Sequence, residues 1–159
     1  MNLSFIQVLE TIAIVVAGTL VGTELAVAVF VHPCLSRLDD ASHVRAVQPL
    51  AAVLGAVMPF WYPLTLVSTL TVAFVARPAG TSGHGAALAA AGLFAAMIVY
   101  SVLLPVPINN QVARFRPEAL PANWRELRRR WDRLHAFRVA VLAAAFILLV
   151  TACVTPSAA

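Results

Sequence analysis

Two side chains near the end of the chain could act together as a base and a cation. His135 and Arg138 lie in the segment RRRWDRLHAFR, residues 128–138, which runs without glycine or proline into an apolar stretch. Trp131, His135 and Arg138 are spaced i, i+4 and i+7, so a helix places them on one face. Such a face suits a flat, anionic, aromatic ligand. The alternative is that Trp131 belongs to an aromatic belt at a membrane interface, while Arg138 extends its charge to the surface.

Asp132 offers a carboxylate close to the same imidazole. Asp132 and His135 are three residues apart, which makes them neighbours on a helix. A carboxylate beside an imidazole raises its basicity and fixes its tautomer. The same spacing can also supply two metal ligands in a helical bundle. The alternative is a surface salt bridge between Asp132 and Arg128 or Arg129.

Glu24 is a carboxylate inside an apolar segment, GTELAVAVFVH, residues 22–32. A carboxylate at membrane depth is costly and normally faces the interior of a bundle with a partner. His32 lies about 12 Å further along a helix and roughly 80° around it, so the two share a broad face. Alternatively, Glu24 is paired with an arginine or protonated by burial, and His32 only binds the last carbonyls of its helix.

The composition indicates which kind of element positions these side chains. The chain has 159 residues, of which 61% are hydrophobic and 11% charged, and its mean hydropathy is +0.87. A soluble domain carries about 25% charged residues, and a chain of this size cannot bury so much apolar surface in one core. We therefore predict an integral membrane protein. Cys34 and Cys153 provide neither a disulfide framework nor a metal-ligand spacing.

Four segments are apolar and long enough to cross a bilayer, which takes about 20 residues. They are residues 12–31, 51–76, 86–105 and 136–154. We predict an all-α fold in which residues 1–159 form a single domain, an up-down four-helix membrane bundle. The first segment lacks a positive n-region and an A-x-A cleavage site, so we expect a retained helix. Pro59 and Pro63 predict a kink or a broken turn in the second span.

The connections between the spans carry most of the charge. We expect helices over 41–50 and over 122–135, the latter an interfacial helix that continues into the fourth span. His43 and His84 are expected in exposed loops. Ten of the eleven arginines fall in the first and third connections, counting Arg138, and only Arg77 falls on the other side. Because positive residues stay inside, we expect a multi-pass protein of the inner cell membrane with cytoplasmic arginine-rich loops and both termini outside.

This topology brings distant residues to one depth in the membrane. The layer contains His32, residues 58–62, the pair Asn109 and Asn110, and the pair Asp132 and His135. Facing helices of a bundle build ligand sites from such layers. Asn109 and Asn110 follow two prolines, which predicts a rigid, non-helical exit from the third span. Their amides are expected to cap the interfacial helix or to hold a carbonyl oxygen.

Two stretches resemble a known family. LPVPINNQVARF, residues 104–115, and NWRELRRRWDRLHAFRVAVLAAAF, residues 123–146, are similar to the DUF1772, or anthrone oxygenase, family of small four-span membrane proteins. The matching residues are Pro107, Asn109 and Asn110, then Arg130, Trp131, His135 and Arg138. The helix end VFVHPCLSRL also resembles the family's Pro-x-Leu turn. Characterised members of that family oxidise anthrones to anthraquinones.

The resemblance implies a membrane-bound oxygenase for an anthrone-like substrate. An anthrone is a flat, apolar phenol with an acidic methylene, and its anion reacts directly with O₂. For this chemistry the catalytic residues are expected to be His135 as base, Asp132 as the group that holds it, and Arg138 as the cation. Glu24 is a further catalytic candidate because of its depth in the membrane, and it is not part of the resemblance. Implied substrate-binding residues are Asn109, Asn110, Trp131 and Arg130, with Arg130 a second candidate for the enolate. No cofactor is required for this chemistry, and the substrate is expected to reach the site from the bilayer.

Two other functions fit the same residues. Glu24, His32, Asp132 and His135 offer mixed nitrogen and oxygen ligands for iron or copper in a metal-dependent oxidoreductase. Alternatively, the chain is a non-enzymatic partner subunit or a transporter-like bundle with Glu24 as a proton relay, and its arginines bind anionic lipid. The charge of +4 is a local patch and does not indicate nucleic acid. Small residues at 85–96 permit close packing within the bundle or in a homo-oligomer.

Overall fold

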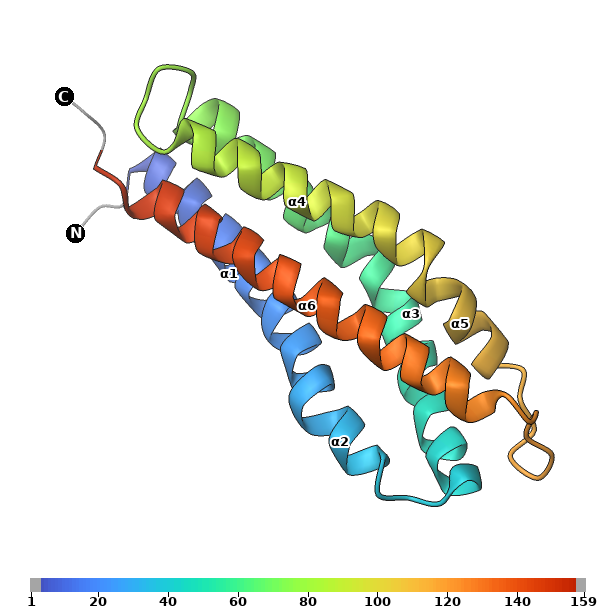
Figure 1. The fold of residues 1–159 in the computed structure, drawn as a ribbon. Coiled ribbons are helices and arrows are strands. Elements are labelled where there is room, and N and C mark those ends of the chain that lie inside the picture. Colours follow the sequence, from blue (N-terminus) through green and yellow to red (C-terminus); the bar gives the residue numbers. More distant parts are fainter. Residues whose placement is uncertain (1–3, 157–159) are drawn as a thin grey trace.

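The computed structural model describes residues 4–156 and confirms the predicted all-α bundle (Figure 1). The chain is 83% helical, and no strand is found in the described residues. The elements are α1 (Phe5–Ala26), η1 (Val27–Val31), α2 (His32–Leu35), α3 (Asp40–Thr71), η2 (Val72–Ala76), α4 (His84–Leu103), α5 (Pro105–Val112) and α6 (Trp124–Val154).

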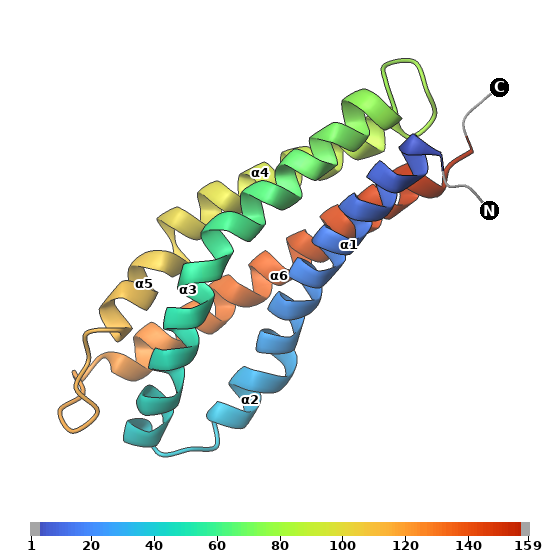
Figure 2. The same ribbon diagram turned by 180° about the vertical axis from the view of Figure 1, so that it is seen from behind.

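Four long helices are apolar enough to cross a membrane, since each contains an 18-residue window with a mean hydropathy between 1.7 and 2.5. They run over Phe5–Leu35, Asp40–Ala76, His84–Val112 and Trp124–Val154. The protein is therefore a multi-pass membrane protein. Each helix is longer than its predicted apolar span because its polar end continues past the apolar stretch, as predicted for residues 41–50 and 122–135. Figure 2 shows the four helices from the other side, with the α1 start and the α6 end together at one end.

Small residues bring the helices of the bundle together. Ala87, Ala90 and Ala91 on α4 are buried, as are Leu142 and Leu149 on α6. One side of the predicted small-residue segment therefore packs inside this bundle, while Ala89 and Gly92 on its other side are exposed. Large apolar side chains such as Phe60 and Leu103 stay exposed, as expected where the solvent is lipid and not water.

The first span changes its helical pitch between its two polar residues. Ser4 caps α1 and forms a capping box with Gln7. The π-helical segment η1 then separates Glu24 from His32. Its wider turn rotates the chain less per residue than an α-helix does. The angle predicted for an ideal α-helix therefore does not apply to this pair.

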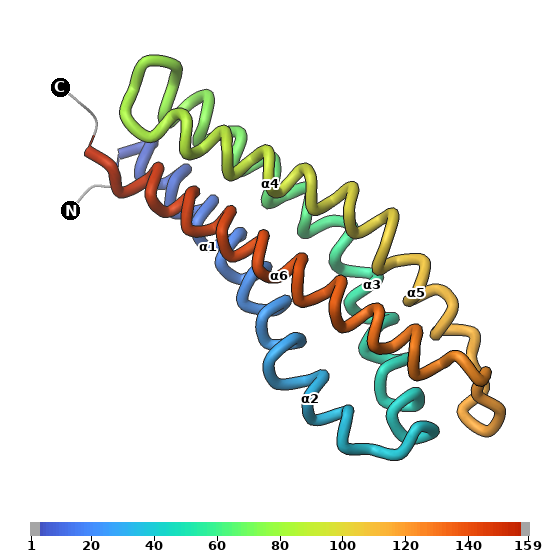
Figure 3. The backbone as a smooth tube through the Cα atoms, viewed as in Figure 1, coloured from blue at the N-terminus to red at the C-terminus, as the bar shows by residue number. Residues whose placement is uncertain are grey.

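The second span begins at the membrane surface and passes through three prolines. The side chain of Asp39 accepts a hydrogen bond of 3.0 Å from the Ser42 amide, and this backbone contact lowers the pKa of Asp39. α3 is a continuous helix through Pro49, Pro59 and Pro63, so the predicted broken turn is wrong. The helix axis bends gently, as the tube in Figure 3 shows. The expected exposure of His43 is also wrong: it is buried in the first turns of α3.

The third span ends in a break at Leu104, where φ is −119° and ψ is −66°. Pro105 then starts α5, at the first helical position, where its missing N–H does no harm. The predicted non-helical exit is therefore wrong, because Asn109 and Asn110 lie within α5. The prolines redirect the helix and do not end it. By contrast, α6 runs unbroken from Trp124, which confirms the predicted fusion of the interfacial helix to the fourth span.

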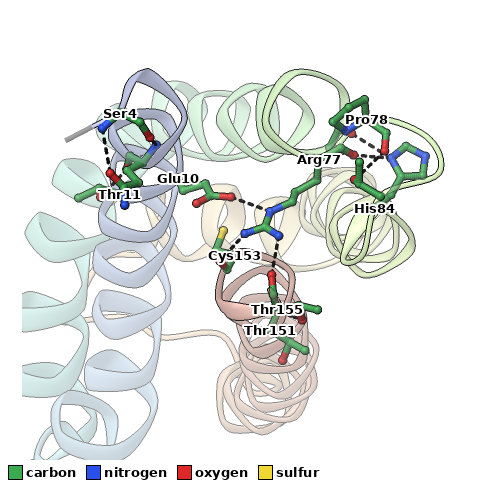
Figure 4. Close-up of polar contacts among 12 residues, drawn as sticks. Ser4, Glu10, Thr11, Arg77, Pro78, His84, Thr151, Cys153 and Thr155 are labelled. Atoms are coloured by element: carbon green, nitrogen blue, oxygen red, sulfur yellow. Dashed lines mark hydrogen bonds and ion pairs between the residues drawn. The ribbon is translucent and has the colours of Figure 1, made fainter. Parts of the chain in front are cut away.

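One arginine ties three helices together at the end of the bundle away from the arginine-rich loops (Figure 4). Arg77 Nε lies 2.8 Å from Glu10 Oε1, and its two terminal nitrogens donate to the carbonyls of Cys153 and Thr155. His84 Nδ1 contacts the Arg77 carbonyl at 2.8 Å. His84 is thus half-buried and bonded, not exposed as predicted. The contacts of Arg77 therefore hold the helices together at the end of the bundle that is far from the candidate site.

The loop between η2 and α4 offers a matched test of backbone strain. Gly80 and Gly83 have φ of +88° and +89°, and a Cβ at Gly83 would lie 2.6 Å from the Ala152 carbonyl oxygen, whereas a Cβ at Gly80 would meet nothing within 4 Å. We expect Gly83→Ala to lower the free energy of unfolding by roughly 2–5 kcal/mol, since strain and a backbone clash combine. Gly80→Ala is expected to lose only about 1–2 kcal/mol. Equilibrium unfolding of both variants in detergent measures the two losses. Equal losses in free energy of unfolding would contradict this packing.

Candidate active site

A buried polar cluster joins four helices in the middle of the bundle. Arg138 Nη2 donates to Glu24 Oε2 at 2.7 Å, and the Tyr62 hydroxyl donates to Glu24 Oε1 at 2.9 Å. Arg138 Nη1 also donates to Ser101 Oγ at 3.3 Å. His135 completes the cluster, with Nδ1 2.9 Å from Arg138 Nη2. Residues from α1, α3, α4 and α6 therefore meet at one point.

The Glu24–Arg138 pair resolves the predicted alternatives for both residues. Glu24 is 3% exposed and Arg138 is 9% exposed, so both charges are withdrawn from solvent. Glu24 has the buried partner that membrane depth demands. The expectation that Arg138 reaches the surface is wrong, because its guanidinium points inward to this carboxylate. The pairing neutralises two charges that would each be very unfavourable alone.

His135 is held by this ion pair through one ring nitrogen only. Its side chain is 2% exposed, and Nδ1 lies 3.4 Å from Glu24 Oε2. The other nitrogen, Nε2, is buried and has no hydrogen-bond partner among residues 4–156. The two contacts of Nδ1 correspond to different tautomers. A proton on Nδ1 directed at Glu24 Oε2 leaves a lone pair on Nε2, whereas accepting a hydrogen bond from the Arg138 guanidinium places the proton on Nε2. The ring is thus oriented and one end is available for chemistry.

Asp132 does not hold His135, contrary to the prediction. Asp132 Oδ1 instead lies 3.1 Å from His32 Nδ1, and Oδ2 lies 3.9 Å from Arg128 Nε. The Trp131 ring stacks on both histidines, with centroid distances of 4.4 Å to His32 and 4.6 Å to His135. Glu24, and not Asp132, is the carboxylate that lies near His135 Nδ1. Trp131 packs within the site and not in a lipid-facing belt.

The four residues of the metal alternative form two separate pairs. Glu24 lies by His135, and His32 lies by Asp132. In the part of the chain that the structure describes, no group of three or more His, Cys, Asp or Glu side chains is placed to hold a metal ion. Glu24 is also already bound by Arg138. The arrangement does not fit the proposed iron or copper site.

A cavity of about 350 Å³ lies against the polar cluster. Its size is within the range of pockets for small organic ligands. Polar groups in its wall come from the cluster and from the arginine-rich end, and the remainder is mainly apolar. Its polar and aromatic lining includes Glu24, His32, His43, Gln48, Tyr62, Ser101, Asn109, Trp124, Arg128, Trp131, His135 and Arg138. Part of the predicted layer lines this cavity: His32, Met58, Pro59, Tyr62, Asn109 and His135 do, whereas Phe60, Trp61, Asn110 and Asp132 do not.

The cavity separates the predicted binding residues into two groups. Asn109 and Trp131 line it, whereas Asn110 and Arg130 are exposed and lie outside its wall. The expected roles of Asn110 and Arg130 at the substrate are therefore wrong. Arg128 is the arginine from this segment that reaches the wall. Arg128 lies three residues before Trp131, so it extends the predicted helix face of Trp131, His135 and Arg138 by one more turn. The helical spacing could therefore have identified it.

Two further residues of the site were not singled out from the sequence. Ser101 was missed although it is a polar residue near the end of an apolar span. Tyr62 was placed in the layer but not identified as a partner of Glu24. A second cavity of about 370 Å³ lies on the other side of His135, and Asp132 and Ser36 are among its lining residues. His135, His32 and Arg128 line both cavities.

The loop over 113–123 covers this end of the bundle. Gln48 donates to the carbonyls of Val112 and Phe115 at 3.1 and 2.9 Å, which joins α3 to the end of α5. Arg45 donates to Glu118 at 2.7 Å, and this hydrogen bond lowers the pKa of Glu118. These contacts close the cavity toward the arginine-rich surface.

Comparison with known proteins agrees with this geometry. The family model for anthrone oxygenase matches residues 56–148, more than half of the chain. The match includes Tyr62, Ser101, Asn109, His135 and Arg138, whereas Glu24 and His32 precede it. No curated protein and no solved structure matches the chain. The chain belongs to the anthrone oxygenase family.

Proposed function

We propose that this protein is a membrane-bound oxygenase that converts an apolar, anthrone-like aromatic to its quinone by proton abstraction and O₂ addition. Membership of the family supports oxygenase activity at that general level. One observation carries the finer proposal. His135 Nδ1 lies beside the Glu24 carboxylate, while its buried Nε2 has no partner among the described residues and the ring lines a cavity of suitable size.

The first step is removal of a methylene proton by His135 Nε2. This step requires the tautomer with a proton on Nδ1, which is directed at the Glu24 carboxylate. The carboxylate then stabilises the imidazolium that forms, as it does in a catalytic triad. Arg138 balances the charge of Glu24 in the resting site. Negative charge on the substrate moves to its carbonyl oxygen. Asn109 and Arg128 are the donors in the cavity wall that can stabilise that oxygen.

The second step joins the carbanion to O₂ and needs no external reductant. A C–O bond forms, and the resulting peroxide takes the proton from the His135 imidazolium. His135 then removes the second methylene proton, the C=O bond forms as the O–O bond breaks, and hydroxide leaves as water with the returned proton. One oxygen atom enters the quinone and the other becomes water. The substrate supplies all four electrons.

We infer the membrane orientation from the arginine distribution. The end of the bundle with α2, α5 and the loop over 113–123 is proposed to face the cytoplasm, because nine of the eleven arginines lie at that end, while Arg138 is in the buried cluster and Arg77 is at the opposite end. The cavity then lies in the cytoplasmic half of the membrane. An apolar substrate dissolved in the bilayer is concentrated at this depth.

Asn109 and Asn110 provide a matched pair for testing substrate contact. Asn109 lines the cavity and Asn110, its neighbour on α5, is exposed. We expect Asn109→Ala to reduce kcat/KM about 10- to 100-fold, because it removes a donor to the developing oxyanion, while Asn110→Ala changes it less than twofold. Steady-state kinetics of both variants check this. Equal losses would show that the amides act through the fold of α5.

The proposal is tested by O₂ uptake of the purified protein in lipid nanodiscs with an anthrone. The expected stoichiometry is one O₂ consumed per quinone formed, at a rate above autoxidation, with one ¹⁸O atom from ¹⁸O₂ in the product. Activity is expected to survive extensive dialysis against chelators. Loss of activity on chelation, restored by added iron or copper, would favour the metal-dependent alternative. Uptake no faster than in empty nanodiscs would contradict the proposed function.

A further inference from the structure

The main cavity is bounded on one side by residues that are also exposed on the outer surface of the bundle. On α3 these residues are Gly55, Pro59 and Pro63. On the facing helices they are Val102 of α4 and Val106 of α5. A residue that lines a cavity and is also exposed lies at its rim. The cavity therefore opens sideways between α3 and the junction of α4 with α5.

The helix geometry explains why the helices separate here. Gly55, Pro59 and Pro63 are spaced four residues apart, so they share one face of α3. Glycine has no side chain to fill the gap, and a Cβ at Gly55 would meet nothing within 4 Å. On the other side, the break at Leu104 redirects the chain into α5. Both ribbon views show α5 displaced from the line of α4 (Figures 1 and 2).

Along the bundle axis, contacts between helices close the cavity on both sides of this opening. Toward the arginine-rich surface, Gln48 joins α3 to the end of α5 with two hydrogen bonds. Toward the centre of the bundle, Thr65 and Thr69 of α3 are fully buried. The route between the cavity and the outside is therefore lateral. The rim residues are all apolar or glycine and lie in two of the four helices that are apolar enough to cross a membrane, so the opening is expected to face acyl chains.

We propose that this opening is the passage by which a flat, apolar aromatic ligand moves between the bilayer and the cavity. The rim is formed by Gly55, Pro59, Pro63, Val102 and Val106. It carries no charged group, so a lipophilic molecule crosses it without losing hydrogen bonds. The choice of an anthrone-like ligand rests on the proposed function, whereas the position of the passage rests on the cavity and its rim alone.

Four phenylalanine variants test the passage. Gly55→Phe and Val102→Phe place a ring at the rim. Gly92→Phe is the control for the glycine, because Gly92 is exposed on α4, outside the cavity wall, and has free space around it. Val99→Phe is the control for the valine: Val99 is 58% exposed and Val102 is 60% exposed on the same helix, and Val99 does not line the cavity.

The first measurement is the rate of anthraquinone binding and release in nanodiscs, followed by quenching of Trp124 and Trp131, which line the cavity. A barrier in a passage slows both rates, because it leaves the bound and free states unchanged. We expect both rate constants to fall about tenfold in Gly55→Phe and Val102→Phe, with Kd changed less than threefold. The two controls are expected to match the wild type. Equal rates in all five proteins would overturn the passage.

A second measurement does not depend on the ligand class. A small nitroxide, 10-doxylnonane, dissolves in the bilayer and quenches tryptophan on contact. We expect the two rim variants to reduce its quenching constant at the cavity tryptophans, relative to both controls. If anthraquinone does not bind but nitroxide access falls in the rim variants, the proposed substrate class is wrong and the passage is supported. Unchanged nitroxide access in the rim variants would overturn the passage whatever anthraquinone does.

Discussion

Replacing His135 by glutamine is expected to lower kcat for an anthrone about 10²- to 10⁴-fold, the range that a positioned general base contributes. Glutamine is close to histidine in size and can still hydrogen-bond to Glu24 and Arg138, which surround Nδ1. It has no basic nitrogen to replace Nε2. The loss should therefore appear in kcat, with binding of the quinone product changed little. O₂ uptake and anthraquinone binding measured on the same preparation check both parts.

The control for this variant is another histidine at the opposite end of the bundle. His84→Gln removes an imidazole that contacts the backbone carbonyls of Ala73 and Arg77, far from the cavity. We expect it to retain kcat within about twofold, because it touches no group in the proposed chemistry. A folded His135→Gln protein with more than about a tenth of the wild-type kcat would exclude His135 as the base.

Replacing Arg138 by methionine is expected to lower the free energy of unfolding by about 3–5 kcal/mol, since it leaves a buried charge without its partner. Glu24 is 3% exposed. Without Arg138 it retains the hydrogen bond from Tyr62 and a distance of 3.4 Å to His135 Nδ1. Neither contact replaces a guanidinium at 2.7 Å. Equilibrium unfolding in mixed micelles measures the loss.

Two further variants show whether the loss arises from the unpaired charge. Arg130→Met removes an exposed arginine from the same helix and is expected to change stability by less than about 0.5 kcal/mol. The double variant Glu24→Gln/Arg138→Met removes both charges and is expected to recover most of the stability, because a neutral amide can still accept from Tyr62. A double variant as unstable as Arg138→Met alone would show that packing, and not charge, holds this part of the bundle.

The two variants separate the roles of the same polar cluster. His135 lines the cavity and is the proposed base, so its replacement is expected to affect chemistry. Arg138 is committed to Glu24 and Ser101, so its replacement affects the fold and the orientation of His135 together. For this reason, the kcat of Arg138→Met can be interpreted only together with the free energy of unfolding of the same variant.

The sequence by itself determined the membrane architecture. Four long apolar segments leave a chain of this size no way to be soluble, and a lipid solvent requires backbone hydrogen bonds within each helix. The continuous helix from residue 124 into the fourth span could also be predicted from the sequence, since this segment contains no helix-breaking residue. Topology then placed His32, Tyr62, Asn109 and His135 at one depth, and they do line one cavity.

Only the tertiary structure decided which of these residues touch. Glu24 and Arg138 are 114 positions apart, and their contact depends on how two helices rotate about their axes. The π-helical segment η1 changes that rotation for His32, and it follows from no residue pattern in the sequence. Asp132 contacts His32 and not His135, although helical spacing favoured the latter.

The same limit applies to residues next to each other in sequence. Asn109 and Asn110 were equivalent candidates, as were Arg128 and Arg130, and in each pair one side chain lines the cavity while the other is exposed. A helix turns about 100° per residue, so membership of the wall depends on which side of α5 or α6 faces the bundle. Packing of the four helices decides which side of each helix faces the bundle. The sequence determines how deep a residue lies in the membrane, but not the direction in which its side chain points.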